Sequence, residues 1–229
     1  MGAIDQPGTR AIPLTGLRGA IARGMQTSWQ APHVTLSLEA DAERFEFARQ
    51  RLSGEVGGKI SITACLVRLV ALTLQDHPHV NARIGEKQIE IVPDINIGIA
   101  VDMNPGLMVP VVKNAEQKTV VDIAVELSML ADGARRGTLT PGTYQGGTFT
   151  ISSLGATEVE VFTPLLNPPQ VAVLGITRIQ AKPVVKDDDI VIKRMMGLHL
   201  SFDHRALDGA PAGRFLTDLK ARVAAGQGL

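Results

Sequence analysis

The sequence predicts one α/β domain built on a mixed β-sheet with packed helices. Segments with apolar residues at helical spacing are interspersed with segments that alternate apolar and polar residues, without strict alternation of the two kinds. No repeat period is visible. The composition does not shift between residues 12 and 229, so we expect one domain there. The Gly/Pro-containing segment 1–11 is typical of a linker or an expression remnant.

For the first part of the chain, the sequence pattern predicts three helices and a strand. Small and apolar residues at helical spacing indicate a helix over 17–29, and HVTLSLEAD (33–41) alternates as a half-buried strand does. AERFEFARQRL (42–52) is a charged amphipathic helix that GEVGGK ends. SITACLVRLVALTLQDH (61–77) is apolar nearly all round, which is typical of a central buried helix, and Ser61 is placed to cap it.

For the middle of the chain, the sequence pattern predicts two strands and a helix. IEIVPDINIGIAVD (89–102) reads as a strand, with Asp102 on the face opposite its aliphatic residues. A Pro-Gly turn separates it from the short strand GLMVPVV (106–112). TVVDIAVELSMLADGARRG (119–137) is a helical pattern with Thr119 at its N-cap.

For the last third of the chain, the sequence pattern predicts three strands and a helix. GGTFTISSLG (146–155) places its threonines and Ser152 on one face, opposite its apolar residues. VAVLGIT (171–177) and DIVIKRMMGLHLSF (189–202) are the other two strands, and APAGRFLTDLKARVA (210–224) is a helix with one apolar face.

The composition argues against nucleic-acid and membrane partners. Lys plus Arg and Asp plus Glu both number 23, so no basic surplus exists, and aromatic residues make up only 3% of the chain. No apolar run reaches the roughly 18 residues of a membrane span, and the N-terminus does not resemble a signal peptide. We therefore expect a soluble intracellular protein. The lone Cys65 lies in an apolar run and is expected to be a small buried residue.

Three kinds of functional site are not supported by the residues that such a site requires. GEVGGKIS lacks the P-loop spacing, because Ser53 stands where glycine is needed and Ile60 where serine or threonine is needed. His77 and His79 have no matching Cys or carboxylate cluster, so no metal site is predicted. No serine lies in a Gly-x-Ser-x-Gly elbow, which leaves a hydrolase triad without support.

Two histidines in HLSFDHRALDG receive different interpretations. His199 alternates with leucines, which favours a solvated strand position. His204 comes just past the strand end among Asp203, Arg205 and Asp208, a position that suits a general base and also suits an ordinary solvent-exposed loop histidine. Asp208 is also placed to cap the final helix. The residues alone therefore indicate a candidate general base but no substrate.

The segment DHRALDG (203–209) resembles the DHRxxDG motif of the dihydrolipoamide acyltransferases, the core components of 2-oxo acid dehydrogenase complexes. Other segments resemble the same family, in the same order along the chain: IPLTGLRGAIARGM (12–25), NIGIAVD (96–102), GLMVPVVKNA (106–115), GGTFTISSLG (146–155) and NPPQVAVLG (167–175). The resemblance covers nearly the whole chain after the linker. It implies a chloramphenicol acetyltransferase-like two-layer sandwich.

The resemblance also implies transfer of an acyl group between the thiols of dihydrolipoamide and coenzyme A. His204 matches the family's general base, Ser152 its oxyanion-stabilising hydroxyl, and Asp208 the aspartate that orders the active-site loop. The family's coenzyme A contacts correspond to Arg49, Ser61, Asp102, Ser152 and Ser153. Alternatively, Arg49 is a solvated helix charge and Ser61 only a helix cap.

The implied assembly is a homotrimer with its active site between subunits, the base coming from one subunit and the serine from the next. Its implied partners are a lipoyl domain, a decarboxylase and a dihydrolipoamide dehydrogenase, in the cytoplasm or, in a eukaryote, the mitochondrial matrix. The chain ends in ARVAAGQGL, without the leucine-rich tail that docks trimers in many members, so the larger cubic or dodecahedral shell stays open. It contains no lipoyl module, so we expect the lipoyl carrier on a separate domain or chain.

TISSLG and the FTP at 162–164 favour an acetyl group. Branched-chain and acetoin-derived groups stay open, whereas a succinyl group would call for a different loop. Two other functions compete: a free-standing acetyltransferase for a small hydroxylated acceptor, and a non-catalytic assembly core with a vestigial site.

Overall fold

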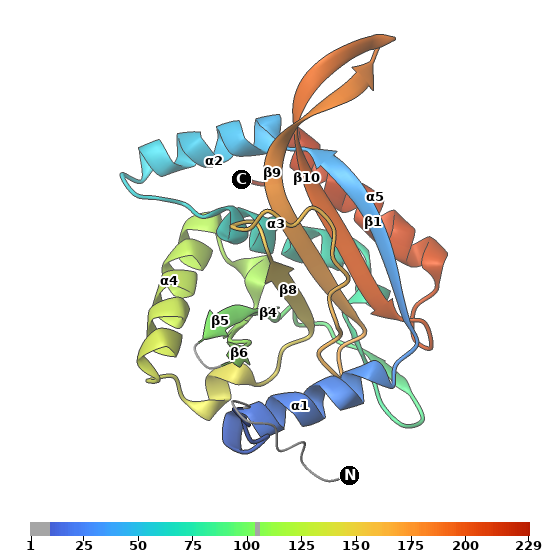
Figure 1. Cartoon of the computed structure of the whole chain (residues 1–229). Coiled ribbons are helices and arrows are strands. Elements are labelled where there is room, and N and C mark those ends of the chain that lie inside the picture. The colour runs from blue at the N-terminus through green and yellow to red at the C-terminus, as the bar shows by residue number, and fades with distance from the viewer. Residues whose placement is uncertain (1–9, 104–105) are drawn as a thin grey trace.

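The computed structural model describes residues 10–103 and 106–229 (Figure 1). Most of the linker predicted over 1–11 and part of the predicted Pro-Gly turn lie outside these residues. Arg10 and Ala11, which are described, are exposed and belong to no helix or strand.

A mixed six-stranded sheet with the strand order β1-β10-β9-β8-β4-β7 forms the centre of the molecule. Its strands in chain order are β1 (His33–Asp41), β4 (Ile97–Ile99), β7 (Val111–Val112), β8 (Phe149–Ser153), β9 (Ala172–Lys186) and β10 (Asp189–Asp203). β8 runs parallel to both of its neighbours, β4 and β9, and the other pairs are antiparallel. Two small hairpins pair β2 (Ala82–Ile84) with β3 (Ile89–Ile91) and β5 (Val101–Met103) with β6 (Gly106–Met108). The predicted mixed sheet is confirmed.

All five predicted helices are present. They are α1 (Gly16–Trp29), α2 (Glu43–Glu55), α3 (Ile62–Asp76), α4 (Val120–Arg136) and α5 (Gly209–Ala225). Three short 3₁₀ turns accompany them: η1 (Pro78–Val80), η2 (Ala115–Gln117) and η3 (Pro141–Tyr144). Their ends follow the sequence signals, since Ser61 Oγ accepts the N–H of Ala64 and Thr119 forms a capping box with Asp122.

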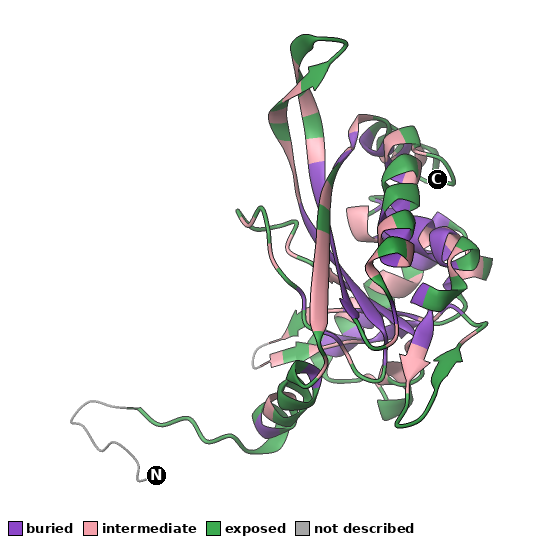
Figure 2. Cartoon of the chain, turned by 90° about the vertical axis from the view of Figure 1, so that its right-hand side faces the viewer, coloured by how far each residue is buried: buried purple, intermediate pink, exposed green. Residues whose placement is uncertain are grey.

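One face of the sheet is apolar and is covered by helices. Phe149, Ile151, Leu174 and Leu200 lie on this face and are fully buried. α5 packs against β1 and α3, and its Phe215 ring lies 5.9 Å from that of Phe149. Figure 2 shows the buried residues concentrated where the helices meet the sheet. This layer of helices on a sheet holds the hydrophobic core.

The opposite face of the sheet is polar and is covered by the strap, residues 154–169, which has neither helix nor strand. α1 and β1 hold one end of the strap. Ser28 Oγ donates to the carbonyl of Leu166 at 2.8 Å, and the N–H of Leu166 donates to His33 Nε2 at 3.1 Å. On the sheet itself, Thr150 Oγ1 donates to Gln170 Oε1 at 2.6 Å. Thr35 and Ser201 form a second such pair on this face, with their hydroxyl oxygens 2.7 Å apart, so individual hydrogen bonds rather than apolar packing connect these polar side chains.

Three predicted strands have the wrong bounds. Segment 89–102 divides into β3, β4 and β5, and segment 106–112 into β6 and β7, in different sheets. The break between β3 and β4 contains Pro93 and the break between β6 and β7 contains Pro110, and proline has no N–H to donate to a ladder. The break between β4 and β5, at Ala100, contains no proline. β9, predicted over 171–177, instead runs on through Lys186.

The extra length of β9, together with the start of β10, forms a hairpin that projects from the body of the molecule (Figure 1). Asp187 and Asp188 form its turn with positive φ values of 52° and 68°. Two such residues give the turn whose twist matches that of the flanking strands, and aspartate tolerates this conformation.

Candidate active site

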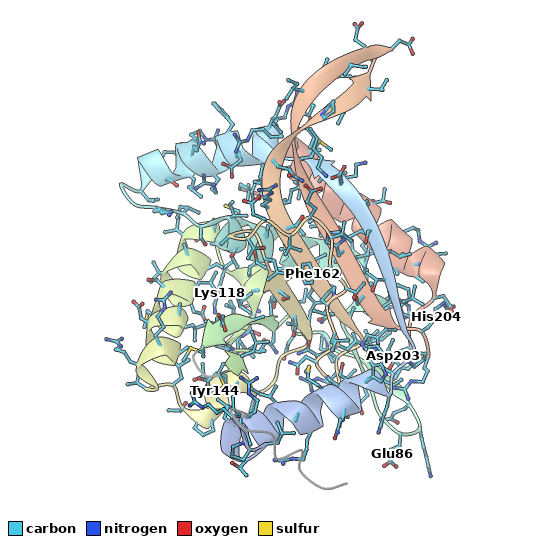
Figure 3. The ribbon with its side chains drawn as sticks, viewed as in Figure 1. Glu86, Lys118, Tyr144, Phe162, Asp203 and His204 are labelled. Carbon is cyan, nitrogen blue, oxygen red and sulfur yellow. The ribbon has the colours of Figure 1, made fainter. Side chains whose placement is uncertain are left out.

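His204 lies just past the end of β10 and is open to solvent. Its main-chain N–H donates to the carbonyl of Pro32 at 3.0 Å, and its side chain is 45% exposed. The imidazole lies against the ring of Phe202, at a centroid distance of 5.7 Å. Figure 3 shows His204 and Asp203 together at this end of the strand. A histidine held by its backbone, with its ring accessible, suits proton exchange with an incoming substrate.

Asp208 contributes less to this loop than the sequence suggests. It occupies the N-cap position of α5, but its carboxylate makes no cap hydrogen bond within the described chain and is 85% exposed. Its Oδ1 lies 3.9 Å from His204 Nδ1, too far for a hydrogen bond. The predicted ordering role of Asp208 is therefore not visible in a single subunit and stays a prediction.

Asp203 orders the loop instead. Its buried carboxylate accepts hydrogen bonds from the N–H and the guanidinium of Arg205, and its carbonyl accepts the N–H groups of Ala206 and Leu207. Burial by itself raises the pKa of Asp203, but the bonds from Arg205 outweigh burial and hold this pKa below its ordinary value. Sequence reasoning missed this role. A signal was available, because Asp at a strand end commonly bonds the N–H two residues on.

Ser152 lies near the end of β8 on the polar face of the sheet and is half-buried. Directly paired residues of neighbouring strands place it in one row with Gly175 of β9, His199 of β10 and Ser37 of β1. Such residues point to the same side of a sheet. The predicted polar face carrying Ser152 is thus confirmed.

Within one subunit, His204 and Ser152 lie far apart. His204 comes five residues after His199, which shares a row with Ser152, so the two are separated by about 16 Å along the strand direction. Two strand spacings add about 10 Å across the sheet. The side chains span only a fraction of this distance, so the two groups of a single chain cannot contact the same reacting carbon.

The prediction that His199 is solvated is wrong. Its side chain is 2% exposed, and its Nδ1 lies 2.8 Å from Ser37 Oγ. Alternation correctly placed His199 on the polar face, but the strap covers this face. Burial lowers the pKa of His199, and the main-chain carbonyl of Glu160 in the strap and the Glu39 carboxylate, which act in the opposite direction, do not offset this effect.

Three of the five predicted coenzyme A residues lie together. Arg49, Ser61 and Ser153 line one cavity of about 430 Å³, together with Lys59 and Arg178. A second cavity, of about 470 Å³, adjoins it and shares Lys59 and Ser61. Sequence reasoning missed Lys59, although its place after two glycines and just before the N-terminus of α3 is a signal for anion binding.

The other coenzyme A residues are placed differently. Asp102 is exposed on β5 and does not line the first cavity, but its neighbour Val101 lines the second. Ser152 lies on the face of β8 opposite Ser153. Arg49 lines the first cavity but is not a solvated charge, because its guanidinium donates to the Glu46 carboxylate and to the carbonyl of Ile60.

Other reactive groups are inert or absent in the described part of the chain. Burial raises the pKa of the Cys65 thiol to about 12, so Cys65 is the small buried residue that was predicted. No group of three or more metal-ligating side chains occurs among residues 10–103 and 106–229. None of the helices in these ranges is long and apolar enough to cross a membrane.

A model of the family described as "2-oxoacid dehydrogenases acyltransferase (catalytic domain)" matches residues 6–228. This chain belongs to that family. It is 37% identical over 222 residues to the dihydrolipoyllysine-residue acetyltransferase component of the acetoin cleaving system of Bacillus subtilis, covering 95% of this chain and 56% of the relative. It is 40% identical over 215 residues to the corresponding component of that organism's pyruvate dehydrogenase complex, covering 90% and 48%. The chain thus spans about half the length of these relatives.

Solved structures of the family superpose closely on this acyltransferase domain. A probable dihydrolipoamide acetyltransferase from Listeria monocytogenes has a TM-score of 0.91 at 38% identity and covers 95% of both chains. A dihydrolipoamide acetyltransferase from Azotobacter vinelandii has a TM-score of 0.89 at 32% identity, covering 98% of this chain and 97% of its own. In that enzyme, the residues investigated for a role in the catalytic mechanism are a serine, a histidine 52 residues later and an asparagine four residues after the histidine.

Two further structures bear on assembly and fold. The cubic core of a pyruvate dehydrogenase multienzyme complex has a TM-score of 0.89 at 33% identity, covering 98% of this chain and 97% of its own. Chloramphenicol acetyltransferase, with a TM-score of 0.54 at 13% identity over 93% of this chain and 99% of its own, shares the fold alone. The predicted chloramphenicol acetyltransferase-like architecture is confirmed.

Proposed function

We propose that this domain transfers an acyl group between the thiols of coenzyme A and of dihydrolipoamide carried on a lipoyl domain, with His204 as general base and Ser152 as oxyanion donor. One observation carries the proposal. Ser152, His204 and Asp208 have the same spacings, 52 and four residues, as the serine, histidine and asparagine of the Azotobacter vinelandii enzyme. Aspartate here replaces asparagine, which leaves an oxygen at that position to face the histidine.

The chemistry fits these side chains. A thiol with an ordinary pKa of about 8.5 is mostly protonated near pH 7, so it needs a base as it attacks. His204 takes the thiol proton while the sulfur attacks the thioester carbonyl, and the Ser152 hydroxyl donates to the resulting oxyanion. When the tetrahedral intermediate collapses, the carbon–sulfur bond to the first carrier breaks and the imidazolium returns the proton to the departing thiolate. The reaction is reversible in this form, because both carriers are thiols.

The proposed active unit is a homotrimer in which each site takes His204 from one subunit and Ser152 from the next. The separation of these residues within one chain supports the proposal, because both must lie within a few ångströms of the acyl carbon. A closed ring of identical head-to-tail contacts forms three equivalent sites.

Coenzyme A would lie along the two adjoining cavities. Lys59 and the N-terminus of α3, which Ser61 caps, would face its phosphates, and Ser153 would lie near the part that leads to Ser152. The bond of Arg49 to Glu46 leaves Arg49 a supporting position in the wall of the first cavity, and Asp102 would contact the ligand at the second.

Both relatives are named as components of larger systems, an acetoin cleaving system and a pyruvate dehydrogenase complex. In such a complex, the proposed partners of this domain are a lipoyl domain, a decarboxylase and a dihydrolipoamide dehydrogenase. Acetyl is the proposed acyl group, since both relatives are acetyltransferases. The cytoplasmic location and the larger shell stay predictions.

Subunit mixing tests this proposal. His204→Ala and Ser152→Ala subunits are unfolded, mixed in equal amounts and refolded, and acetyl transfer from acetyl-CoA to dihydrolipoamide is measured. Each variant alone should lose at least about 99% of the activity. If the site is shared between neighbours, random assortment makes about a quarter of the sites intact, so about a quarter of the native activity should return.

Refolded native protein and each variant refolded alone are the controls. No recovery in mixtures that contain mixed trimers would contradict the shared site. Full activity of either variant alone would contradict the assigned chemistry.

A further inference from the structure

His199, the buried histidine on the polar face, lies near Ser152, and a role for His199 in catalysis rests on the proposed role of Ser152. His199 and Ser152 belong to the same cross-strand row and are separated in it only by Gly175 of β9. Two strand spacings amount to about 10 Å, so the space between the two side chains is the size of one further side chain.

That space is filled from the strap. A Cβ atom on Gly175 would lie 2.8 Å from Cζ of Phe162 and 3.2 Å from Cδ of Pro164. The Phe162 ring thus occupies the place of the missing side chain, between Ser152 and His199. Figure 3 shows Phe162 over the middle of the sheet, well away from His204.

His199 forms the support on the far side of this ring. The centroids of the Phe162 and His199 rings are 5.8 Å apart, and the rings are tilted by 57°. Ser37 Oγ, 2.8 Å from Nδ1, holds the imidazole in orientation. The other nitrogen, Nε2, is buried and has no hydrogen-bond partner within the described residues. His199 is therefore placed by its packing and by a single hydrogen bond.

The strap is tethered on both sides of Phe162, and Pro164 two residues later is buried against Gly175. Arg178 pairs with Glu158 and Glu160 near the start, and Leu166 bonds to α1 and β1 near the end. These tethers fix the course of the backbone, and Phe162 between them belongs to no helix or strand, so its contacts with Gly175 and His199 orient its ring.

We propose that His199 is a positioning residue for acyl transfer: it holds Phe162 over Gly175 and so fixes the wall beside the Ser152 hydroxyl. When the oxygen of an acyl group accepts a hydrogen bond from the Ser152 hydroxyl, the carbonyl carbon would lie within contact distance of this wall. Without His199, the ring can retreat into the space that the imidazole leaves. Water then enters the oxyanion site, and the position of the acyl group beside Ser152 is less fixed. The same space accommodates a longer acyl chain.

The test compares acetyl-CoA with butyryl-CoA as donors to dihydrolipoamide, in the intact trimer. His199→Ala should lower kcat for acetyl transfer about tenfold, with KM for acetyl-CoA within about twofold of native. It should also raise the ratio of butyryl to acetyl kcat/KM by about fivefold or more. A merely structural role would lower both rates alike and leave the ratio unchanged.

Three further variants sharpen the test. His199→Phe keeps an aromatic ring without the hydrogen bond, and its ratio should stay near native. Ser37→Ala keeps the imidazole but removes its hydrogen bond, and it should shift the ratio in the same direction as His199→Ala, by about twofold. The exposed His79→Ala is the matched control and should change nothing.

Ser37 is exposed, so Ser37→Ala should fold and decide the matter if His199→Ala does not. If the ratio of butyryl to acetyl kcat/KM is native in Ser37→Ala, and in His199→Ala where that variant folds, the proposed role of His199 is wrong. The proposed function would still hold in that case, provided that Ser152→Ala is inactive. Full activity of Ser152→Ala overturns the proposed function, and the role of His199 with it.

Discussion

The two faces of the six-stranded sheet are covered by different kinds of structure. On one face, α3 and α5 bury aliphatic and aromatic side chains in a continuous core. On the other, the irregular strap covers a polar row that contains Ser152 and His199, with hydrogen bonds and ion pairs at separate points. Non-directional packing stabilises the first face, whereas the second depends on individual contacts. We therefore expect substitutions on the helix face to change stability and those on the strap face to change activity.

The largest effect expected on the helix face comes from Phe215→Ala. Phe215 is fully buried on α5 beside Phe149, so its loss leaves a cavity in the core. The free energy of unfolding should fall by about 3–5 kcal/mol, as measured by denaturant titration. Phe47, on α2, is 70% exposed, so Phe47→Ala is a matched control that should cost less than about 1 kcal/mol. Equal losses in the two variants would contradict the placement of the core.

Ser152→Ala should have the opposite profile. Its kcat for acetyl transfer should fall about 100–1000-fold, because one oxyanion donor is lost. Its unfolding free energy should stay within about 0.5 kcal/mol of native, since the hydroxyl is only half-buried. A loss of stability large enough to account for the loss of rate would show that Ser152 belongs to the scaffold instead.

Acid should act on the loop that carries His204. The pKa of Asp203 is lowered in the folded protein, so its ion pair with Arg205 contributes stability above the ordinary aspartate pKa of about 4. That contribution is lost as the pH falls below this value and through the lower folded pKa. Asp203→Asn should be about 1–3 kcal/mol less stable at pH 7. The difference between native and variant in urea titrations should shrink as the pH falls below about 4. If the free energies of unfolding of native protein and Asp203→Asn instead differ by the same amount at every pH, the Asp203 carboxylate does not order the loop.

The smallest effect separates two interpretations of Ser61. Ser61→Ala removes the N-cap of α3, and Thr119→Ala removes that of α4, so each should cost about 1 kcal/mol. If Ser61 also contacts coenzyme A, only Ser61→Ala should raise KM for acetyl-CoA. An unchanged KM in both variants would leave Ser61 as a helix cap alone.

Local signals predicted the elements well where one kind of signal was complete. α3 and α4 carry an apolar stripe together with a cap, and β1 alternates along its whole length, so each was predicted close to its observed bounds. Segments 89–102 and 106–112 mix alternation with an internal proline, and the chain there divides between sheets. β9 continues past its apolar part as an exposed hairpin, in which pairing with β10 outweighs the polar sequence.

The candidate site was predictable only in part. The placement of His204 at a strand end followed from the residues, but the choice of Ser152 depended on a family resemblance. His199 was misjudged because alternation tells which face of a sheet a residue occupies and not what covers that face. The cover is the strap, whose lack of periodic pattern conceals its position from any local analysis.

The sequence by itself determined the helices, the polar face of β8 and the exposed strand-end loop with its histidine, because caps, periodicity and turn residues act over a few positions. Only the tertiary structure decided that His204 and Ser152 lie at different ends of the sheet and that His199 is buried beneath the strap. Strand order and register bring together residues far apart in the chain, and they are set by the packing of the whole domain.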